Sequence, residues 1–237
     1  MAERLLLVDT ATQTGSVAVS QGEKLLGEIV LNGPANHTDH LLGNIDELLR
    51  GVGLAIGDMD AFGVVLGPGS FTGLRVGVAT VKGLALATGK PVVGVSSLAA
   101  LAWRLPFAEL PVCPLLDARK GEVYAALYQW SGDEFSPLLA PCVVPPERWL
   151  ERLAGDVLFV GDGVQSYRGL IEESLGGRAR FAPWPAQACR ASNGLGPALA
   201  RLRRGEHIAL ERLVPTYIRP SEAELAAAEE TVGNRGH

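Results

Sequence analysis

Residues 67–77 read Gly67-Pro68-Gly69-Ser70-Phe71-Thr72-Gly73-Leu74-Arg75-Val76-Gly77, and this stretch decides the fold. It follows an apolar, strand-like run at 61–66 and opens a helix-like run at 72–88. A strand, a glycine-rich turn and a helix in this order are typical of α/β proteins, which often place ligand or partner contacts at such a turn. The stretch is neither a Walker A loop, because no Gly-Lys-Ser/Thr follows, nor a GxGxxG fingerprint.

The composition is that of a globular protein with enough apolar residues for a core. The chain has 237 residues, of which 47% are hydrophobic and 20% are charged, so it can form one domain or two small lobes. Its formal net charge is −5, which argues against a stand-alone nucleic-acid binder, because such proteins carry basic surfaces. The basic cluster at 201–204 is interpreted as a solvent-exposed helix face.

Cysteine usage and hydropathy point to the cytoplasm. The three cysteines, Cys113, Cys142 and Cys189, form no CxxC pair, so neither a disulfide framework nor a zinc knuckle is expected. The chain opens directly on a strand-like run, and no apolar run reaches the roughly 18 residues of a membrane span. We therefore predict a soluble, cytoplasmic protein that does not associate with a membrane.

Hydrophobic patterning predicts alternating strands and helices in the first half of the chain. The predicted elements are strands at 4–9, 15–20 and 24–31, a helix at 38–50, a strand at 61–66, a helix at 72–88, a strand at 91–95 and a helix at 97–104. The helix at 38–50 is amphipathic, with its apolar residues on one face. This βββαβαβα order resembles the ribonuclease-H-like unit found in each half of actin, hexokinase and Hsp70.

The second half of the chain reads as a smaller, degenerate copy of the first. Its predicted elements are strands at 112–117, 122–129 and 138–144, a helix at 146–153, a strand at 157–160, and helices at 163–175 and 193–204. Pro106 and Pro111 suggest a boundary between the halves. The predicted fold is therefore a two-lobed, actin-like α/β ATPase fold, with lobes at 1–105 and 106–220 and a frayed tail at 221–237.

Several motifs, taken in order, resemble the bacterial TsaB (YeaZ) family. They are Leu5–Thr12, Gly15–Val19, His37–Leu42, Gly67–Gly77, Leu115–Tyr124 and Pro215–Arg219, and the resemblance covers roughly residues 4–220. That family takes part in making threonylcarbamoyladenosine on tRNA. The segments 67–77 and 117–124 are the most specific parts of the resemblance.

Residues at two strand ends indicate a nucleotide cleft between the lobes. In the actin-like superfamily the first hairpin carries an acid and hydroxyls that face phosphate and Mg²⁺, which implies Asp9 and Thr10 here. Asp117 and Arg119 occupy the matching turn of the second lobe, and paired carboxylates suit hydrated Mg²⁺. Residues 160–163 resemble the turn that contacts adenosine, which implies Gly161 and Gly163. The alternative is that Asp9 and Asp117 only cap turns and that the nucleotide site is vestigial. We favour this alternative. We therefore expect no required cofactor and only weak binding of Mg²⁺ with ATP or ADP.

Neither a metal site nor a nucleophile stands out. His37 and His40 are three residues apart, whereas TsaD relatives that bind metal use a HisxxxHis pair, and no third ligand is obvious. Ser70 and Thr72 lie in the glycine turn without an accompanying histidine or acid in sequence. Thr72 is better interpreted as the N-cap of the following helix. We expect no metal and no catalytic residue in this chain.

The helix at 72–88 has two apolar faces, and both must be covered. Leu74, Val78, Val81 and Ala85 are expected to face the lobe's own sheet. Small residues on the other side allow another helix to approach closely. The sequence leaves open whether this second cover belongs to the same chain or to a partner. TsaB proteins pair with TsaD through the helices corresponding to 38–50 and 72–88, which implies a partner surface made of His37, Leu41, Ile45, Gly69, Phe71, Thr72, Gly73, Val76, Gly77, Thr80 and Leu84.

The resemblance implies a structural rather than a catalytic role. The chain would bind the catalytic TsaD subunit and, together with the ATPase TsaE, support transfer of a threonylcarbamoyl group to N6 of adenosine 37 of tRNA. Contact with tRNA would be only indirect, and the same two helices would allow a homodimer. Two rival functions are a small phosphotransferase that uses Asp9 and Asp117, and a metallopeptidase that uses His37 and His40.

Overall fold

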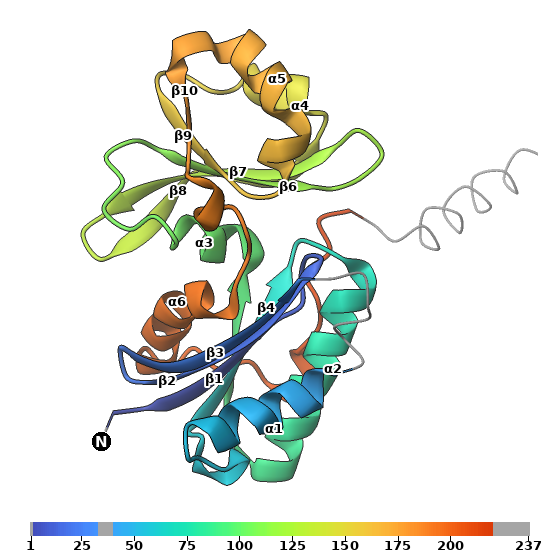
Figure 1. The fold of residues 1–237 in the computed structure, drawn as a ribbon, viewed down its shortest axis with the longest axis vertical. Coiled ribbons are helices and arrows are strands. Elements are labelled where there is room, and N and C mark those ends of the chain that lie inside the picture. The colour runs from blue at the N-terminus through green and yellow to red at the C-terminus, as the bar shows by residue number, and fades with distance from the viewer. Residues whose placement is uncertain (1, 33–39, 220–237) are drawn as a thin grey trace, which may run out of the picture.

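The computed structural model describes residues 2–32 and 40–219. The tail at 221–237, the first two residues of the helix predicted at 38–50, and His37 lie outside the described residues. Figure 1 shows two β-sheets, each with helices on its faces, and two further helices in the space between the sheets. Both sheets have five strands. This is the α/β, two-lobed actin-like fold that the sequence predicts.

The first sheet has its most apolar strand in the centre. Its strands are β1 (Arg4–Asp9), β2 (Thr14–Gln21), β3 (Lys24–Asn32), β4 (Ala61–Gly67) and β5 (Val92–Ser96), in the order β3-β2-β1-β4-β5. β1 pairs antiparallel with β2 and parallel with β4. Leu6 and Val8 of β1 belong to one core cluster, and Leu5 and Leu7 belong to another. The strand is therefore buried on both faces, as its continuous apolar run indicates.

The second sheet repeats the topology of the first. Its strands are β6 (Val112–Asp117), β7 (Val123–Ser131), β8 (Glu134–Val144), β9 (Val157–Val160) and β10 (Ala179–Phe181), in the order β10-β9-β6-β7-β8. The helices α4 (Pro146–Leu150) and α5 (Gly163–Leu175) follow the third and fourth of these strands. β10 was not predicted, because three residues give too little periodicity to recognise. β8 also begins four residues earlier than predicted.

Two helices cover one face of the first sheet, and short 3₁₀ turns complete the structure. The helices are α1 (Leu41–Gly51) and α2 (Phe71–Thr88). Both contribute buried residues to the cluster that contains Leu6 and Val8. The 3₁₀ turns are η1 (Ile56–Asp58), η2 (Gly176–Arg178), η3 (Trp184–Ala186) and η4 (Leu210–Arg212).

The last helix of each half packs beside the other half (Figure 1). α6 (Ala191–Arg203) buries Leu195 and Leu199 in the cluster formed by Leu5 and Leu7 of the first sheet. α3 (Ser97–Ala102) buries Leu98 and Leu101 in a cluster with strands of the second sheet. The strands of residues 4–96 form the first sheet and those of residues 112–181 form the second, but not every later element stays with the second sheet. The final helix returns to the first sheet, because the apolar stripe of α6 fits the open face of that sheet.

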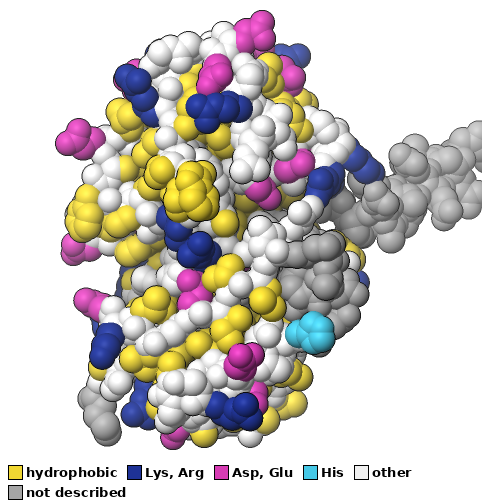
Figure 2. Space-filling model, in the orientation of Figure 1, with side chains coloured by type: hydrophobic (Ala, Val, Ile, Leu, Met, Phe, Trp, Pro, Cys, Tyr) yellow, Lys and Arg dark blue, Asp and Glu magenta, His cyan; other side chains and the backbone are white. Residues whose placement is uncertain are grey.

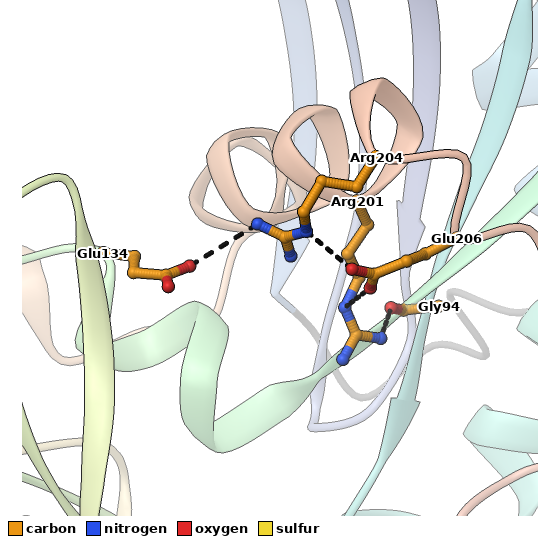
Figure 3. Close-up of polar contacts among 5 residues, drawn as sticks. All are labelled: Gly94, Glu134, Arg201, Arg204 and Glu206. Carbon is orange, nitrogen blue, oxygen red and sulfur yellow. Dashed lines mark hydrogen bonds and ion pairs between the residues drawn. The ribbon is translucent and has the colours of Figure 1, made fainter.

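Arginines anchor the C-terminal end of α6 (Figure 3). Arg201 donates to the carbonyl of Gly94 at 2.7 Å. Arg204 lies 2.5 Å from Glu206 and 3.6 Å from Glu134 of β8. These ion pairs are solvent-exposed, and such pairs contribute little to stability. These contacts lie at the end of α6 and add little to its stability.

The structure corrects four residues of the predicted partner surface. Leu41 and Ile45 are each only 3% exposed and belong to the chain's own core, because the apolar face of α1 packs on the sheet. Gly73 and Gly77 are also buried. A Cβ atom at Gly73 would overlap the carbonyl oxygen of Thr10, and one at Gly77 would overlap the Thr10 hydroxyl. These glycines therefore bring α2 against the turn after β1 and not against a partner.

Glycine substitutions in α2 should distinguish a glycine that is packed against Thr10 from one that faces solvent. We expect Gly73→Ala to lower the free energy of unfolding by about 2 kcal/mol or more, because the added methyl group overpacks the contact with Thr10. Gly83 has open space around it, so Gly83→Ala should raise the free energy of unfolding by about 1 kcal/mol through helix propensity alone. Urea denaturation of both variants measures this. Equal effects of the two substitutions would contradict the packing described here.

Candidate functional site

The outer face of α2 is apolar and open to solvent. The exposed residues of the helix, which we call the outer face of α2, are Phe71, Thr72, Arg75, Ala79, Gly83, Leu86 and Ala87. Leu86 is 76% exposed, and Leu42 on α1 is 62% exposed. Leu74, Val78, Val81 and Ala85 are buried against the sheet, as predicted. The helix therefore has a second, largely apolar face, and among the described residues Tyr217 covers only its start, at Phe71 and Arg75.

The predicted partner residues on α2 fall into three environments. Phe71 and Thr72 lie on the outer face, and Val76, Thr80 and Leu84 are half-buried at its margin. Gly73 and Gly77 face inward, as described above. The partner surface predicted from the sequence did not include Leu86 or Leu42, although both are large apolar residues that the structure leaves exposed.

An aromatic stack extends the outer face at the start of α2. The rings of Phe71 and Tyr217 lie 5.0 Å apart, and the Arg75 guanidinium lies 3.9 Å from the centre of the Phe71 ring. Arg75 also donates from Nε to the Tyr217 hydroxyl at 3.0 Å. Sequence reasoning noted residues 215–219 but did not place them here, because no local pattern indicates a contact across 142 residues.

The glycine-rich turn is held by the turn that follows β1. The Ser70 backbone N–H donates to the carbonyl of Ala11 at 2.7 Å, and a Cβ atom at Gly69 would overlap that carbonyl. The Ser70 hydroxyl accepts from the N–H of Gly73 at 3.2 Å. Ser70, and not Thr72, is therefore the N-cap of α2. The Ser70 hydroxyl caps the first turn of α2, so its role is structural.

A cavity of about 380 Å³ lies between the two lobes. Its lining comes from the turn after β1, the end of β3, the start of α5 and the segment before α6, namely Thr12, Gln13, Thr14, Val30, Asn32, Asp162, Gln165, Trp184, Pro185, Gln187, Ala188, Cys189 and Arg190. None of the six residues predicted for the nucleotide cleft is in this lining. The residues that line the cavity were not singled out from the sequence.

Four of the six predicted cleft residues are buried. Asp9 and Thr10 are fully buried. Gly161 and Gly163 both lie against the backbone of Leu115, and the Gly161 N–H donates to the Gln187 side chain at 2.7 Å. The φ angle of Gly161 is 119°, a value that side chains rarely adopt. The glycines therefore permit close packing in the second lobe.

The Asp117 carboxylate accepts a hydrogen bond from the backbone of the turn that follows it. Its carboxylate accepts from the Arg119 N–H at 2.8 Å and lies 3.5 Å from the Arg119 guanidinium. The Asp117 N–H donates to the carboxylate of Asp162 at 3.1 Å. Desolvation raises the pKa of Asp162, and the neighbouring charge of Asp117 adds to this effect. These contacts match the turn-capping alternative for Asp117.

The described part of the chain offers no site for a metal ion. No group of three or more His, Cys, Asp or Glu residues in it could hold one. The pair of His37 and His40 cannot be assessed, because His37 lies outside that part. The three cysteines are free. None of the described helices is long and apolar enough to cross a membrane.

Comparison with known proteins places the chain in a family. A family model described as TsaD, tRNA N6-adenosine threonylcarbamoyltransferase, matches residues 24–227. The tRNA threonylcarbamoyladenosine biosynthesis protein TsaB of Escherichia coli is 36% identical, with 93% of this chain and 96% of that protein covered. TsaB of Bacillus subtilis is 32% identical over the same shares. YeaZ of Pseudomonas aeruginosa superposes with a TM-score of 0.77 at 32% identity, covering 91% of this chain and 99% of that one.

The chain belongs to the TsaB (YeaZ) family. This confirms the resemblance seen in the motifs, and the relatives match along nearly their whole length. The matching segments at 67–77 and 117–124 supply no side chain to the lining of the cavity.

Asp9 is a fully buried carboxylate whose hydrogen bonding is incomplete. One carboxylate oxygen accepts from the Ala11 N–H at 2.9 Å, and the other has no hydrogen-bond partner within the described residues. Burial raises the pKa of Asp9 from 3.8 to about 6, and the charge of Glu28 adds to this effect. Burying a carboxylate without full hydrogen bonding disfavours its charged form. Asp9 is therefore poorly placed to bind a hydrated cation in this conformation.

The raised pKa of Asp9 predicts a specific pH dependence. Between roughly pH 4 and pH 6 the folded protein keeps a proton that the unfolded chain has lost, so the free energy of unfolding falls as the pH rises, by about 3 kcal/mol in total. Asp9→Asn mimics the protonated form and should remove this fall, giving a variant that is more stable than the wild type near neutral pH. Urea denaturation across this pH range measures the effect.

The exposed Asp133 provides the control for this measurement. Asp133→Asn should retain the fall seen in the wild type, because its side chain is in solvent. An Asp9→Asn variant that keeps the full pH dependence would show that another group causes it.

Proposed function

We propose that this chain is a non-catalytic subunit that binds a TsaD-type catalytic subunit in the formation of threonylcarbamoyladenosine in tRNA. The names of its TsaB relatives support the pathway. The observation that carries the proposal is the apolar outer face of α2, with Leu86 on α2 and Leu42 on the neighbouring helix both more than half exposed. An apolar face of this kind on a folded lobe marks a site of protein association.

The contacts of the candidate catalytic groups support a non-catalytic role. The Ser70 hydroxyl caps α2, and the Asp117 carboxylate holds its own turn. Asp9 is buried away from the cavity. Ser70 and Asp117, two of the groups that a hydrolase or a phosphotransferase could use, thus make their contacts within the chain's own turns. The chemistry of the pathway then belongs to the catalytic partner.

The outer face of α2 also suits self-association. A helix face that binds a related fold can bind a second copy of this chain, so we propose that a homodimer forms through α1 and α2 when the catalytic subunit is absent. A TsaE-type ATPase would join the complex through other surfaces. Contact with tRNA would remain indirect, because the net charge of −5 opposes strong binding to phosphates.

Charged substitutions on the two exposed leucines test the partner face. We expect Leu86→Asp and Leu42→Asp to raise the dissociation constant for a TsaD protein from the same organism by about tenfold or more, since burying a leucine contributes about 1.5–3 kcal/mol. Melting temperatures should change little, because both side chains are already in solvent. Calorimetric titration and light scattering measure binding and stoichiometry.

Leu138 provides a matched control on the second lobe. It is 53% exposed on β8, and Leu138→Asp should leave binding unchanged. If Leu138→Asp weakened the complex as much as Leu86→Asp, or if neither variant weakened it, the partner face would lie elsewhere.

We further propose that the chain binds Mg²⁺-ATP weakly or not at all when alone. The cavity carries the single carboxylate of Asp162 and no lysine, and Asp9 is excluded from it. Calorimetric titration of the chain with Mg²⁺-ATP should give no micromolar binding. Tight binding that is lost in Asp117→Asn would favour the phosphotransferase alternative instead.

A further inference from the structure

β3 is an edge strand of the first sheet. In the order β3-β2-β1-β4-β5 it has a neighbouring strand on one side only. Within residues 2–32 and 40–219, only β2 forms backbone hydrogen bonds with it. In Figure 1, α6 and α1 lie on opposite sides of the first sheet, and β3 runs along the edge that faces the viewer. Figure 2 shows hydrophobic side chains and backbone atoms open to solvent along this edge. The outward N–H and C=O groups of β3 are therefore available to another strand.

The other three sheet edges are protected against such pairing. On β5, the carbonyl of Val92 accepts from the Ile208 N–H at 2.8 Å, so a later segment covers this edge. β8 contains Pro137 and Pro141, and β10 has only three residues. A covering segment, a proline and a short length are devices by which proteins prevent pairing at sheet edges. β3 has nine residues, no proline and, among the residues that the structure describes, no covering segment.

A bulge confines the open edge to the second part of β3. The register with β2 shifts at Leu26, which has no direct partner on β2. Because a bulge locally disrupts regular pairing, the regular stretch is 27–32, which reads Gly-Glu-Ile-Val-Leu-Asn. Glu28 is its one charged residue, and Leu31 is 39% exposed. A partner strand would therefore pair with residues 27–32 and cover apolar side chains that now contact water.

We propose that a second copy of this chain pairs with this edge. The two β3 strands lie antiparallel across a two-fold axis, and the two first sheets form one continuous sheet. The stretch 27–32 is self-complementary in one register. When Glu28 of one copy lies opposite Asn32 of the other, Ile29 lies opposite Leu31, and the two-fold axis repeats both pairs. Apolar residues then face each other and no like charges are opposed, whereas a register centred on Glu28 would oppose two carboxylates.

This contact is separate from the outer face of α2. It uses the edge of the sheet itself, whereas the outer face of α2 points away from the sheet. It also requires no catalytic subunit, so it can fail or hold independently of the function proposed above. Leu86→Asp disrupts association through α2 and leaves the β3 edge unchanged, so this variant isolates the strand contact.

Sedimentation velocity of the full-length Leu86→Asp variant over a wide range of protein concentration tests the proposal. The variant should form dimers as its concentration rises. Hydrogen exchange of the amides in residues 24–32 should slow in parallel, because the edge N–H groups gain acceptors. A variant that stays monomeric at every concentration would overturn the proposal. A dimer in which these amides exchange as fast as in the monomer would overturn it as well.

Substitutions in β3 of the same Leu86→Asp variant test the register. Leu31→Lys should raise the dissociation constant of the dimer by about tenfold or more, because a lysine on an edge strand opposes pairing. Asn32→Lys should lower it by about threefold, since each lysine would lie opposite a Glu28 carboxylate. Asn32→Glu should raise it, because like charges would be opposed. Asn32 is exposed, so the last two variants should remain folded even if Leu31→Lys does not.

Leu138→Lys is the matched control, because it places a lysine at an exposed leucine of the edge strand β8. It should leave the dissociation constant unchanged. Equal effects of Leu31→Lys and Leu138→Lys, or of Asn32→Lys and Asn32→Glu, would contradict strand pairing between two copies. If Leu31→Lys weakened the complex with a TsaD protein while this chain alone stayed monomeric, a strand of that partner would occupy the edge and the second copy would be excluded.

Discussion

The contact between the start of α2 and the turn after β1 is the constraint on which the first lobe depends. The Thr10 hydroxyl donates to the carbonyl of Gly73 at 2.7 Å, and the Ser70 N–H donates to the carbonyl of Ala11 at 2.7 Å. These bonds form only because Gly69, Gly73 and Gly77 lack side chains. The close approach fixes the direction in which α2 leaves the sheet. It therefore determines which face of α2 is buried and which remains available to a partner.

The exchange of α3 and α6 is the second organising feature. Each helix follows the last strand of one sheet and packs near the other, so the lobes share a common middle layer (Figure 1). Apolar residues of α6 stabilise its contact with the first sheet, and apolar residues of α3 stabilise its contact with the second sheet.

The family resemblance and the structure contribute different parts of the functional argument. The motifs identified the TsaB family, but they did not show which side chains reach the cavity. Asp9 belongs to the most recognisable segment of the chain, yet it is buried and has no access to the cavity. The partner surface shows the same limit, because Leu41 and Gly77 are core residues whereas Leu86 and Leu42 are exposed. A motif locates a segment along the chain, and only packing decides which of its atoms are exposed.

The sequence by itself determined the strand and helix order, the repeat of that order, and the family. Periodicity and turn residues are local properties, so strands such as β1 and helices such as α2 were predicted nearly to the residue. Only the tertiary structure decided the return of α6 to the first sheet and the stacking of Phe71 on Tyr217. These features join residues that are far apart in the chain, such as the 142-residue separation of Arg75 and Tyr217. No local pattern encodes them, because their free energy comes from surfaces that exist only after both lobes have folded.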